Sequence, residues 1–172
     1  MKITTDTNVL LSATLWEGDS FRILKKVENQ EIELVLCEEI LQEYVNVLAY
    51  SDIQEKIKDK ELIVRTSVEE LRAMSTIVFP TIKIDIVKKD PSDNKIIECA
   101  LEGKASYMIT HDNHLLVLKK FREIKIVRPE EFGMLLNGGK LNQYDVSAYI
   151  HIQGKQFSNG FNYRKLIFNQ LS

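Results

Sequence analysis

The sequence predicts a three-layer α/β/α protein whose central sheet is parallel. Short apolar runs rich in β-branched residues alternate with stretches of helical periodicity throughout residues 1–139. Parallel strands need a crossover connection, usually a helix, so this alternation favours helices on both faces of the sheet. The chain has 172 residues, of which 44% are hydrophobic, and this suffices for an ordinary buried core.

Five strands are predicted, each a short apolar run that ends near polar or turn-forming residues. In chain order they span residues 2–6, 32–37, 83–87, 106–110 and 124–127. The first begins with β-branched residues and ends at Asp6, where a polar break follows. The last is closed by Pro129, which cannot continue a sheet ladder.

The predicted helices carry apolar residues at intervals of three and four. They span residues 20–27, 38–48, 92–103, 115–121 and 130–136. Ser20 caps the first helix, Ser92 caps the third, and Gly103 ends the third. A further helical region, broken near residues 66–67, extends to Pro80.

The character of the sequence changes near Lys140, which we take as a domain boundary. Residues 140–172 carry four basic residues against Asp145, a net charge of +3, so residues 1–139 carry −5 within a total of −2. This extension also holds six of the fourteen aromatic residues. Alternating apolar residues and the turn signal Asn159-Gly160 predict a β-hairpin there. We expect it to be a packing or dimerisation arm rather than a surface on which single-stranded RNA stacks.

Composition argues against several classes of protein. No stretch approaches the roughly 20 apolar residues that a membrane span requires, and the N-terminus lacks the apolar core of a secretory signal. We therefore expect a cytoplasmic protein without a membrane partner. Cys37 and Cys99, far apart in apolar segments, indicate core residues rather than a disulfide framework or a zinc cluster. Residues 1–139, with their net negative charge, would bind polyanions poorly without bound cations.

Acidic residues follow three of the predicted strands. Asp6 follows the first strand, Asp90 and Asp93 follow the third, and Asp112 follows the fourth. The carboxyl ends of parallel strands meet at one edge of the sheet, where ligands bind. Glu43, on the helix after the second strand, can reach the same edge. Four carboxylates, those of Asp6, Glu43, Asp93 and Asp112, are therefore expected to converge.

Converging carboxylates raise one another's pKa and weaken a fold unless a cation compensates. Oxygen ligands with no histidine or cysteine among them suit Mg²⁺ or Mn²⁺ rather than zinc. One or two such ions can activate water and polarise a phosphodiester. The expected chemistry is therefore metal-assisted hydrolysis of a phosphate ester.

Simpler interpretations exist for single residues. Asp6 could be a turn residue or a helix cap, and Asp93 a first-turn acid that the helix dipole favours. Glu43 could face solvent, in which case Glu39, one turn earlier, is the substitute. The joint pattern favours the ligand interpretation.

Four segments of the chain, taken together, resemble the acidic motifs of PIN domains. They are Thr5-Asp6-Thr7-Asn8-Val9-Leu10, Glu39-Ile40-Leu41-Gln42-Glu43-Tyr44, Asp90-Pro91-Ser92-Asp93-Asn94-Lys95 and Ile109-Thr110-His111-Asp112. Their order and spacing match over residues 1–137. Within that family, the motifs resemble those of single-domain bacterial and archaeal VapC-like toxins of toxin-antitoxin pairs.

The resemblance implies an Mg²⁺- or Mn²⁺-dependent endoribonuclease that cuts RNA and leaves a 5′-phosphate. The metal ligands it implies are Asp6, Glu43, Asp93 and Asp112. It also implies a homodimer and an antitoxin that fills the catalytic groove. Asn8 and Thr110 match positions that support the acids through hydrogen bonds. Asp90 is the candidate for holding a metal-bound water.

Basic residues and histidines also lie near the motifs. Lys88, Lys89 and Lys95 flank the third motif and are candidates for RNA phosphate binding, although exposed lysines often have no such role. His111 and His114 are interpreted as surface or loop histidines rather than general bases.

Two alternatives of a different class stay open. One is a catalytically inactive PIN-like module that binds RNA or scaffolds a complex, against which the four acids argue. The other is a small-molecule phosphohydrolase with an aspartate nucleophile, but that chemistry needs a second aspartate where this chain has Asn8. A toxin and an RNA-processing enzyme would share these residues, so the RNA target is left open.

Overall fold

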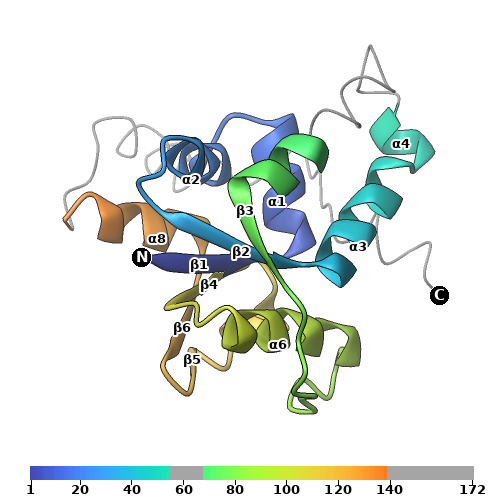
Figure 1. Cartoon of the computed structure of the whole chain (residues 1–172), viewed down its shortest axis with the longest axis vertical. Coiled ribbons are helices and arrows are strands. Elements are labelled where there is room, and N and C mark those ends of the chain that lie inside the picture. Colours follow the sequence, from blue (N-terminus) through green and yellow to red (C-terminus); the bar gives the residue numbers. More distant parts are fainter. Residues whose placement is uncertain (55–67, 139–172) are drawn as a thin grey trace, which may run out of the picture. The chain divides into compact units, whose positions relative to one another are not determined.

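The computed structural model describes residues 1–54 and 68–138 (Figure 1). Contacts within the chain divide it into two units, Met1–Leu136 and Asn137–Ser172, and the fold below is that of the first. The β-hairpin predicted in residues 140–172 lies outside the described residues, and the boundary between residues 139 and 140 stays a prediction. Within the described ranges, no helix has the length and apolarity to cross a membrane.

A six-stranded sheet forms the centre of the described unit (Figure 1). From one edge to the other its strands are β3 (Ser75–Val78), β2 (Glu33–Cys37), β1 (Lys2–Thr5), β4 (Tyr107–Ile109), β6 (Ile124–Val127) and β5 (Lys120–Phe121). All neighbours pair in parallel except β5 and β6, which form an antiparallel edge. The predicted α/β fold with a central parallel sheet is therefore confirmed.

Helices lie between most of these strands along the chain, whereas a turn joins β5 to β6. The helices are α1 (Thr7–Leu15), α2 (Asp19–Glu28), α3 (Glu38–Leu48), α4 (Ser51–Gln54), α6 (Asn94–Glu102), α7 (Asn113–Leu116) and α8 (Pro129–Leu136). A short 3-10 helix, η1 (Pro91–Asp93), precedes α6, and residues 68–74 are helical before β3.

Helices cover both faces of the sheet, as side-chain alternation along β1 shows. Ile3 and Thr5 line a cavity together with side chains of α1 and α2. Thr4, between them in sequence, donates a hydrogen bond to Cys99 Sγ of α6 at 3.6 Å on the opposite face. The next strand, β2, is buried from Leu34 to Cys37, as expected of a strand between two helical layers.

The third strand lies elsewhere than the sequence predicts. The helical region was expected to extend to Pro80 and a strand to occupy residues 83–87, but β3 occupies residues 75–78 and residues 83–87 are irregular. Backbone N–H groups of this irregular segment donate to the side chains of Glu98 and Asn94 on α6. The segment is therefore held by a helix rather than by a neighbouring strand, and alternation of isoleucines alone does not make it a strand.

Two helices differ from the predictions at the carboxyl ends of strands. Where the sequence predicts a polar break after β1, α1 begins directly, with Asp6 as its N-cap. Helix α7 is shorter than the predicted helix over residues 115–121, because Lys119 and Arg122 adopt positive φ angles of 57° and 51° around β5. Helices α1 and α7 each begin close behind a strand, so their N-termini lie at the edge of the sheet where the acidic residues lie.

Candidate active site

The strand order changes direction at β1, which lies between β2 and β4. The carboxyl ends of β1 and β4 therefore form the switch point at which open α/β sheets bind ligands. Asp6 follows β1 directly, and its backbone N–H donates to the carbonyl of Ile109, the last residue of β4, at 3.3 Å. Asp112 follows three residues later, so the first and fourth acidic motifs lie on adjacent strands.

Asp6 is held at both carboxylate oxygens. Oδ1 accepts the backbone N–H of Val9 at 2.7 Å, which caps α1, and Oδ2 accepts a hydrogen bond from the hydroxyl of Thr110. Only 4% of Asp6 is exposed, and burial raises its pKa while the bonds from Thr110 and Val9 oppose that rise. Asp6 is thus both the helix cap of the simpler interpretation and a fixed carboxylate at the switch point.

Thr110 connects Asp6 to Asp112. Its hydroxyl gives its one proton to Asp6 and accepts the backbone N–H of Asp112 at 2.8 Å. Asp112 is buried and caps α7, where its Oδ1 accepts the backbone N–H of His114 at 2.6 Å. The predicted support of the acids by Thr110 thus has a structural counterpart in this pair of bonds.

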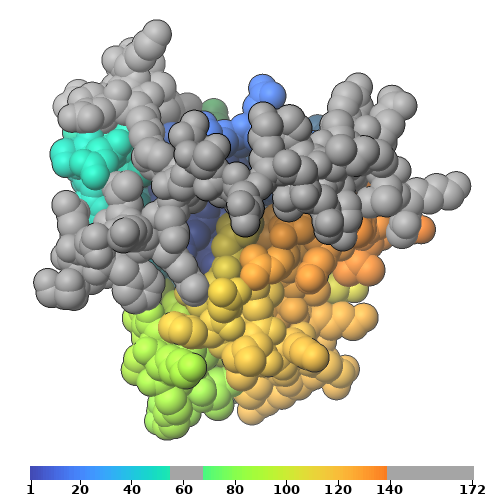
Figure 2. All heavy atoms as spheres, turned by 180° about the vertical axis from the view of Figure 1, so that it is seen from behind, coloured from blue at the N-terminus to red at the C-terminus, as the bar shows by residue number. Residues whose placement is uncertain are grey.

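Asp93 lies at the junction of η1 and α6, close to Asp112 and His114. Burial, and then the negative charges of Asp90, Asp112, Asp6 and Glu43, raise this pKa to about 7 from an ordinary 3.8. Coulomb repulsion weakens with distance, so all four carboxylates lie within effective range of Asp93. In the space-filling view the green segment before α6 lies beside the yellow segment after β4 (Figure 2), and ligand atoms of Asp93 and Asp112 lie within 4.8 Å of one another.

Glu43 reaches the group from α3 and lies at its rim, with 43% of its side chain exposed. Its Oε2 accepts a hydrogen bond from the hydroxyl of Thr7 at 2.9 Å and pairs with Lys95 Nζ at 2.8 Å. Both contacts use the same oxygen, so they hold the carboxylate from one side.

Two further residues singled out from the sequence, Glu39 and Asn8, have less direct links to the four acids. Glu39, the substitute for Glu43, is exposed and is not among the carboxylates that chiefly raise the pKa of Asp93. In the described ranges no hydrogen bond joins Asn8 to the four acids, and its support of them stays a prediction. Thr7, its neighbour, provides such a bond instead. The sequence did not predict α1, so nothing in it indicated that Thr7 lies on a helix.

The turn that carries Asp93 is held by local hydrogen bonds. Asp90 Oδ1 accepts the backbone N–H and the hydroxyl of Ser92 at 3.2 and 2.5 Å, and the Asn94 amide donates to the Pro91 carbonyl at 2.9 Å. Asp90 is therefore the first residue of a capped turn beside the acids.

The three lysines differ in their surroundings. Lys88 and Lys89 are exposed, and Lys88 pairs with Asp85 in its own segment. Lys95 is only 25% exposed and pairs with Glu43. Of the three, Lys95 alone contacts one of the four predicted ligands.

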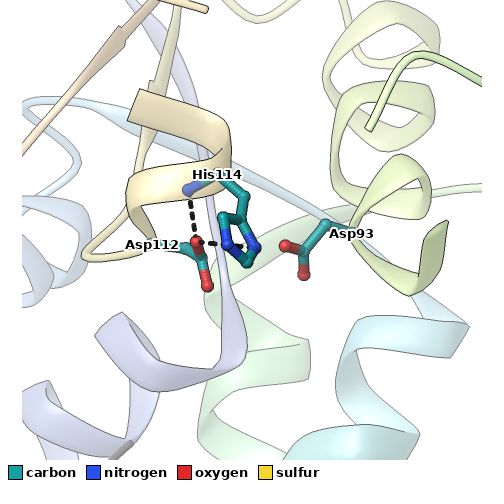
Figure 3. Close-up of side chains that lie close together, drawn as sticks. All are labelled: Asp93, Asp112 and His114. Atoms are coloured by element: carbon teal, nitrogen blue, oxygen red, sulfur yellow. Dashed lines mark hydrogen bonds and ion pairs between the residues drawn. The ribbon is translucent and has the colours of Figure 1, made fainter. Parts of the chain in front are cut away.

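His114, expected from the sequence to be a surface or loop histidine, lies beside Asp93 and Asp112. Its ring lies between the carboxylates of Asp112 and Asp93 (Figure 3), and ligand atoms of the three residues lie within 4.8 Å of one another. Nδ1 lies 3.8 Å from Asp112 Oδ1, and 31% of the side chain is exposed. The signal that could have identified His114 is its place in the first turn of a helix that Asp112 caps.

The residues present fit a divalent cation. Two buried polar atoms of the cluster, Asp93 Oδ2 and His114 Nδ1, have no hydrogen-bond partner among the described residues. Buried polar atoms without a partner are rare in folded proteins and are often satisfied by an ion or water. A cation would satisfy both atoms and reduce the repulsion that raises the pKa of Asp93.

The fold and this acidic edge define a three-layer α/β protein with a candidate metal site at the switch point of its sheet. A family model described as PIN domain matches residues 2–114. The chain belongs to the PIN-domain family, so the resemblance stated from the four motifs is confirmed. Proteins of this family are generally nucleases and typically use divalent metal ions.

Among solved structures, one chain of the crystal structure of VapBC2 from Rickettsia felis, bound to a DNA fragment from the promoter, is similar in fold. The TM-score is 0.50 at 15% sequence identity, and the match covers 73% of the present chain and 97% of that one. The comparison with curated proteins gave no match.

Proposed function

We propose that the protein is an Mg²⁺- or Mn²⁺-dependent endoribonuclease that hydrolyses phosphodiester bonds of single-stranded or structured RNA. The observation that carries this proposal is the cluster at the switch point, where ligand atoms of Asp93, Asp112 and His114 lie within 4.8 Å of one another. Burial, and then the charges of four other carboxylates, also raise the pKa of Asp93 to about 7. Acids crowded in this way are costly for a fold and fit a role in holding cations. Membership of a family of nucleases supports the same chemistry.

In this proposal the ion is held by Asp6, Glu43, Asp93 and Asp112. When bound, it supplies an activated water and polarises the phosphodiester. The chain fixes the ligands through Thr110 and the two helix caps, which keeps the carboxylates in place before substrate arrives. Asp90 is proposed to orient a water, and the residues proposed to contact RNA phosphates are Lys88, Lys89 and Lys95.

The biological role we propose is that of a toxin in a toxin-antitoxin pair. Residues 1–139 would form the nuclease domain, acting in the cytoplasm as a homodimer that a cognate antitoxin inhibits. The VapC-like motifs and the fold similarity to a chain of VapBC2 support this assignment. A small open reading frame immediately upstream of the gene would strengthen it.

The test is RNA cleavage by wild type and Asp6→Asn, with Mg²⁺ or Mn²⁺ and with chelator. Asparagine can still cap α1 but lacks the negative charge of aspartate. Loss of a residue that only hydrogen-bonds to a metal ligand typically costs 10- to 100-fold in activity, so loss of the ligand itself should cost more. Asp52→Asn, an exposed change on α4, is the matched control and should cleave like wild type.

Full cleavage by Asp6→Asn, or cleavage unaffected by chelator, would refute the proposed site. RNA binding without uptake of a divalent ion would favour the inactive PIN-like module. Hydrolysis of a generic phosphomonoester in place of RNA would favour the small-molecule phosphohydrolase.

A further inference from the structure

The His114 imidazole occupies a position that the four-carboxylate site does not explain. Its Nδ1 is buried and has no hydrogen-bond partner in the described part of the chain, as is also true of Asp93 Oδ2. These two unsatisfied atoms belong to one cluster with Asp112, whose ligand atoms all lie within 4.8 Å of one another (Figure 3). A surface histidine would direct its ring nitrogens to solvent.

The spacing of the cluster is too wide for direct hydrogen bonds and a few tenths of an ångström wider, between His114 and Asp112, than that of two atoms bound to one ion. Nδ1 of His114 and Oδ1 of Asp112 are 3.8 Å apart, which is too long for a hydrogen bond. Ligand atoms that each lie about 2.0 to 2.2 Å from one ion are separated by roughly 3 to 3.5 Å. The backbone N–H of His114 also donates to Asp112, so the histidine is anchored at the carboxylate it would share an ion with.

We propose that His114 is a direct ligand of the metal ion and makes the site a mixed nitrogen and oxygen site that prefers Mn²⁺ to Mg²⁺. The inference rests on the proposed function and deepens it by naming the metal selectivity. Mg²⁺ keeps oxygen ligands and water, whereas an imidazole nitrogen favours transition-metal ions over Mg²⁺. This revises the expectation of an oxygen-only ligand set.

The experiment uses the full chain and Mn²⁺ or Mg²⁺ alone, without RNA. Mn²⁺ should bind wild type more tightly than Mg²⁺ in calorimetric titrations, and pulsed EPR of bound Mn²⁺ should show coupling to a directly bound ¹⁴N. His114→Ala should lose that coupling and bind Mn²⁺ about 10- to 100-fold more weakly, with a smaller change for Mg²⁺. His111→Ala, the exposed histidine beside Asp112, is the matched control and should keep both properties.

An unchanged Mn²⁺ affinity in a folded His114→Ala variant, verified by circular dichroism, would overturn the proposal, as would ¹⁴N coupling that persists in that variant. The readout separates this inference from the nuclease assignment. Cleavage of RNA by a protein whose Mn²⁺ shows no ¹⁴N coupling would leave the nuclease standing and remove His114 from the ligands. Mn²⁺ bound through His114 without any RNA cleavage would support the ligand and remove the nuclease.

Discussion

One hydroxyl group links the two most buried acids of the site. Thr110 donates to Asp6 and accepts from the backbone of Asp112, so Thr110→Val removes both bonds while keeping the shape of the side chain. We expect a loss of about 1 to 3 kcal/mol in the free energy of unfolding, because buried polar groups are left unpaired. Mn²⁺ affinity should fall about 10- to 100-fold. Denaturant unfolding and calorimetric titration measure the two effects.

Thr110→Ser is the control for this prediction, because it keeps the hydroxyl and loses only a methyl group. Serine should retain most of the Mn²⁺ affinity even if it costs some stability. If Thr110→Val bound Mn²⁺ as wild type does, the hydroxyl would have no part in orienting the ligands.

At the level of single residues, the sequence predicts the acids better than their partners. An aspartate at the end of a strand is fixed by backbone direction, so Asp6 and Asp112 could be assigned from the strand pattern. The hydrogen bond from Thr7 to Glu43 depends on α1 starting at residue 7, which the polar sequence after Asp6 did not indicate. His114 depends in the same way on the first turn of α7.

Helix α6 organises the third acidic motif. Asn94 Oδ1 accepts the backbone N–H groups of Ile86 and Val87, both at 3.0 Å, and Nδ2 donates to the Pro91 carbonyl. Asn94→Ala should therefore destabilise the protein by about 1 to 3 kcal/mol. It should also weaken Mn²⁺ binding, because the turn that carries Asp93 loses its anchor.

Equilibrium unfolding and a Mn²⁺ titration check this prediction. Gln42→Ala, which removes an exposed amide bonded to a neighbour on the same helix, is the matched control and should stay within about 0.5 kcal/mol of wild type. If Asn94→Ala behaved like this control, the hydrogen bonds of Asn94 would not be what holds the segment before Asp93.

Element positions were predictable where local pattern and tertiary context agree. Helix α3 occupies Glu38–Leu48, as predicted, because its apolar stripe is buried in the core. The segment over residues 83–87 has the alternation of a strand, yet its N–H groups bond to Glu98 and Asn94. Whether these N–H groups bond to side chains of α6 or to a neighbouring strand depends on tertiary contacts, which a local stretch of sequence does not show.

At the level of the whole molecule, the sequence predicts the class of fold but not the strand order. Alternating strands and helices require a parallel α/β arrangement, whereas the position of the switch point between β1 and β4 depends on how the crossovers return. That order decides which acids meet. The convergence of the acids was inferred instead from the rule that the carboxyl ends of parallel strands meet at one edge of the sheet.

The acidic site also makes the stability of the whole fold depend on pH. Burial and neighbouring carboxylates raise the pKa of Asp93 from 3.8 to about 7 in the folded, metal-free chain. Between these values the folded chain keeps a proton that the unfolded chain has lost, so the free energy of unfolding falls as pH rises through this window. We expect metal-free wild type to be less stable at about pH 8 than at about pH 5.5, and Asp93→Asn to show a smaller difference. Denaturant unfolding with chelator at both pH values measures it.

The same proton should compete with the metal ion. Because Asp93 must lose its proton to bind a cation, Mn²⁺ affinity should rise by up to about tenfold per pH unit below pH 7 and level off above it. Asp52→Asn should follow the wild-type curve, whereas Asp93→Asn should bind weakly with a flatter dependence. A wild-type affinity that stayed constant between about pH 5.5 and pH 8 would mean that Asp93 takes no part in binding the ion. Saturating Mn²⁺ should likewise remove the loss of stability at the higher pH, because the bound charge replaces the proton as the partner of the crowded carboxylates.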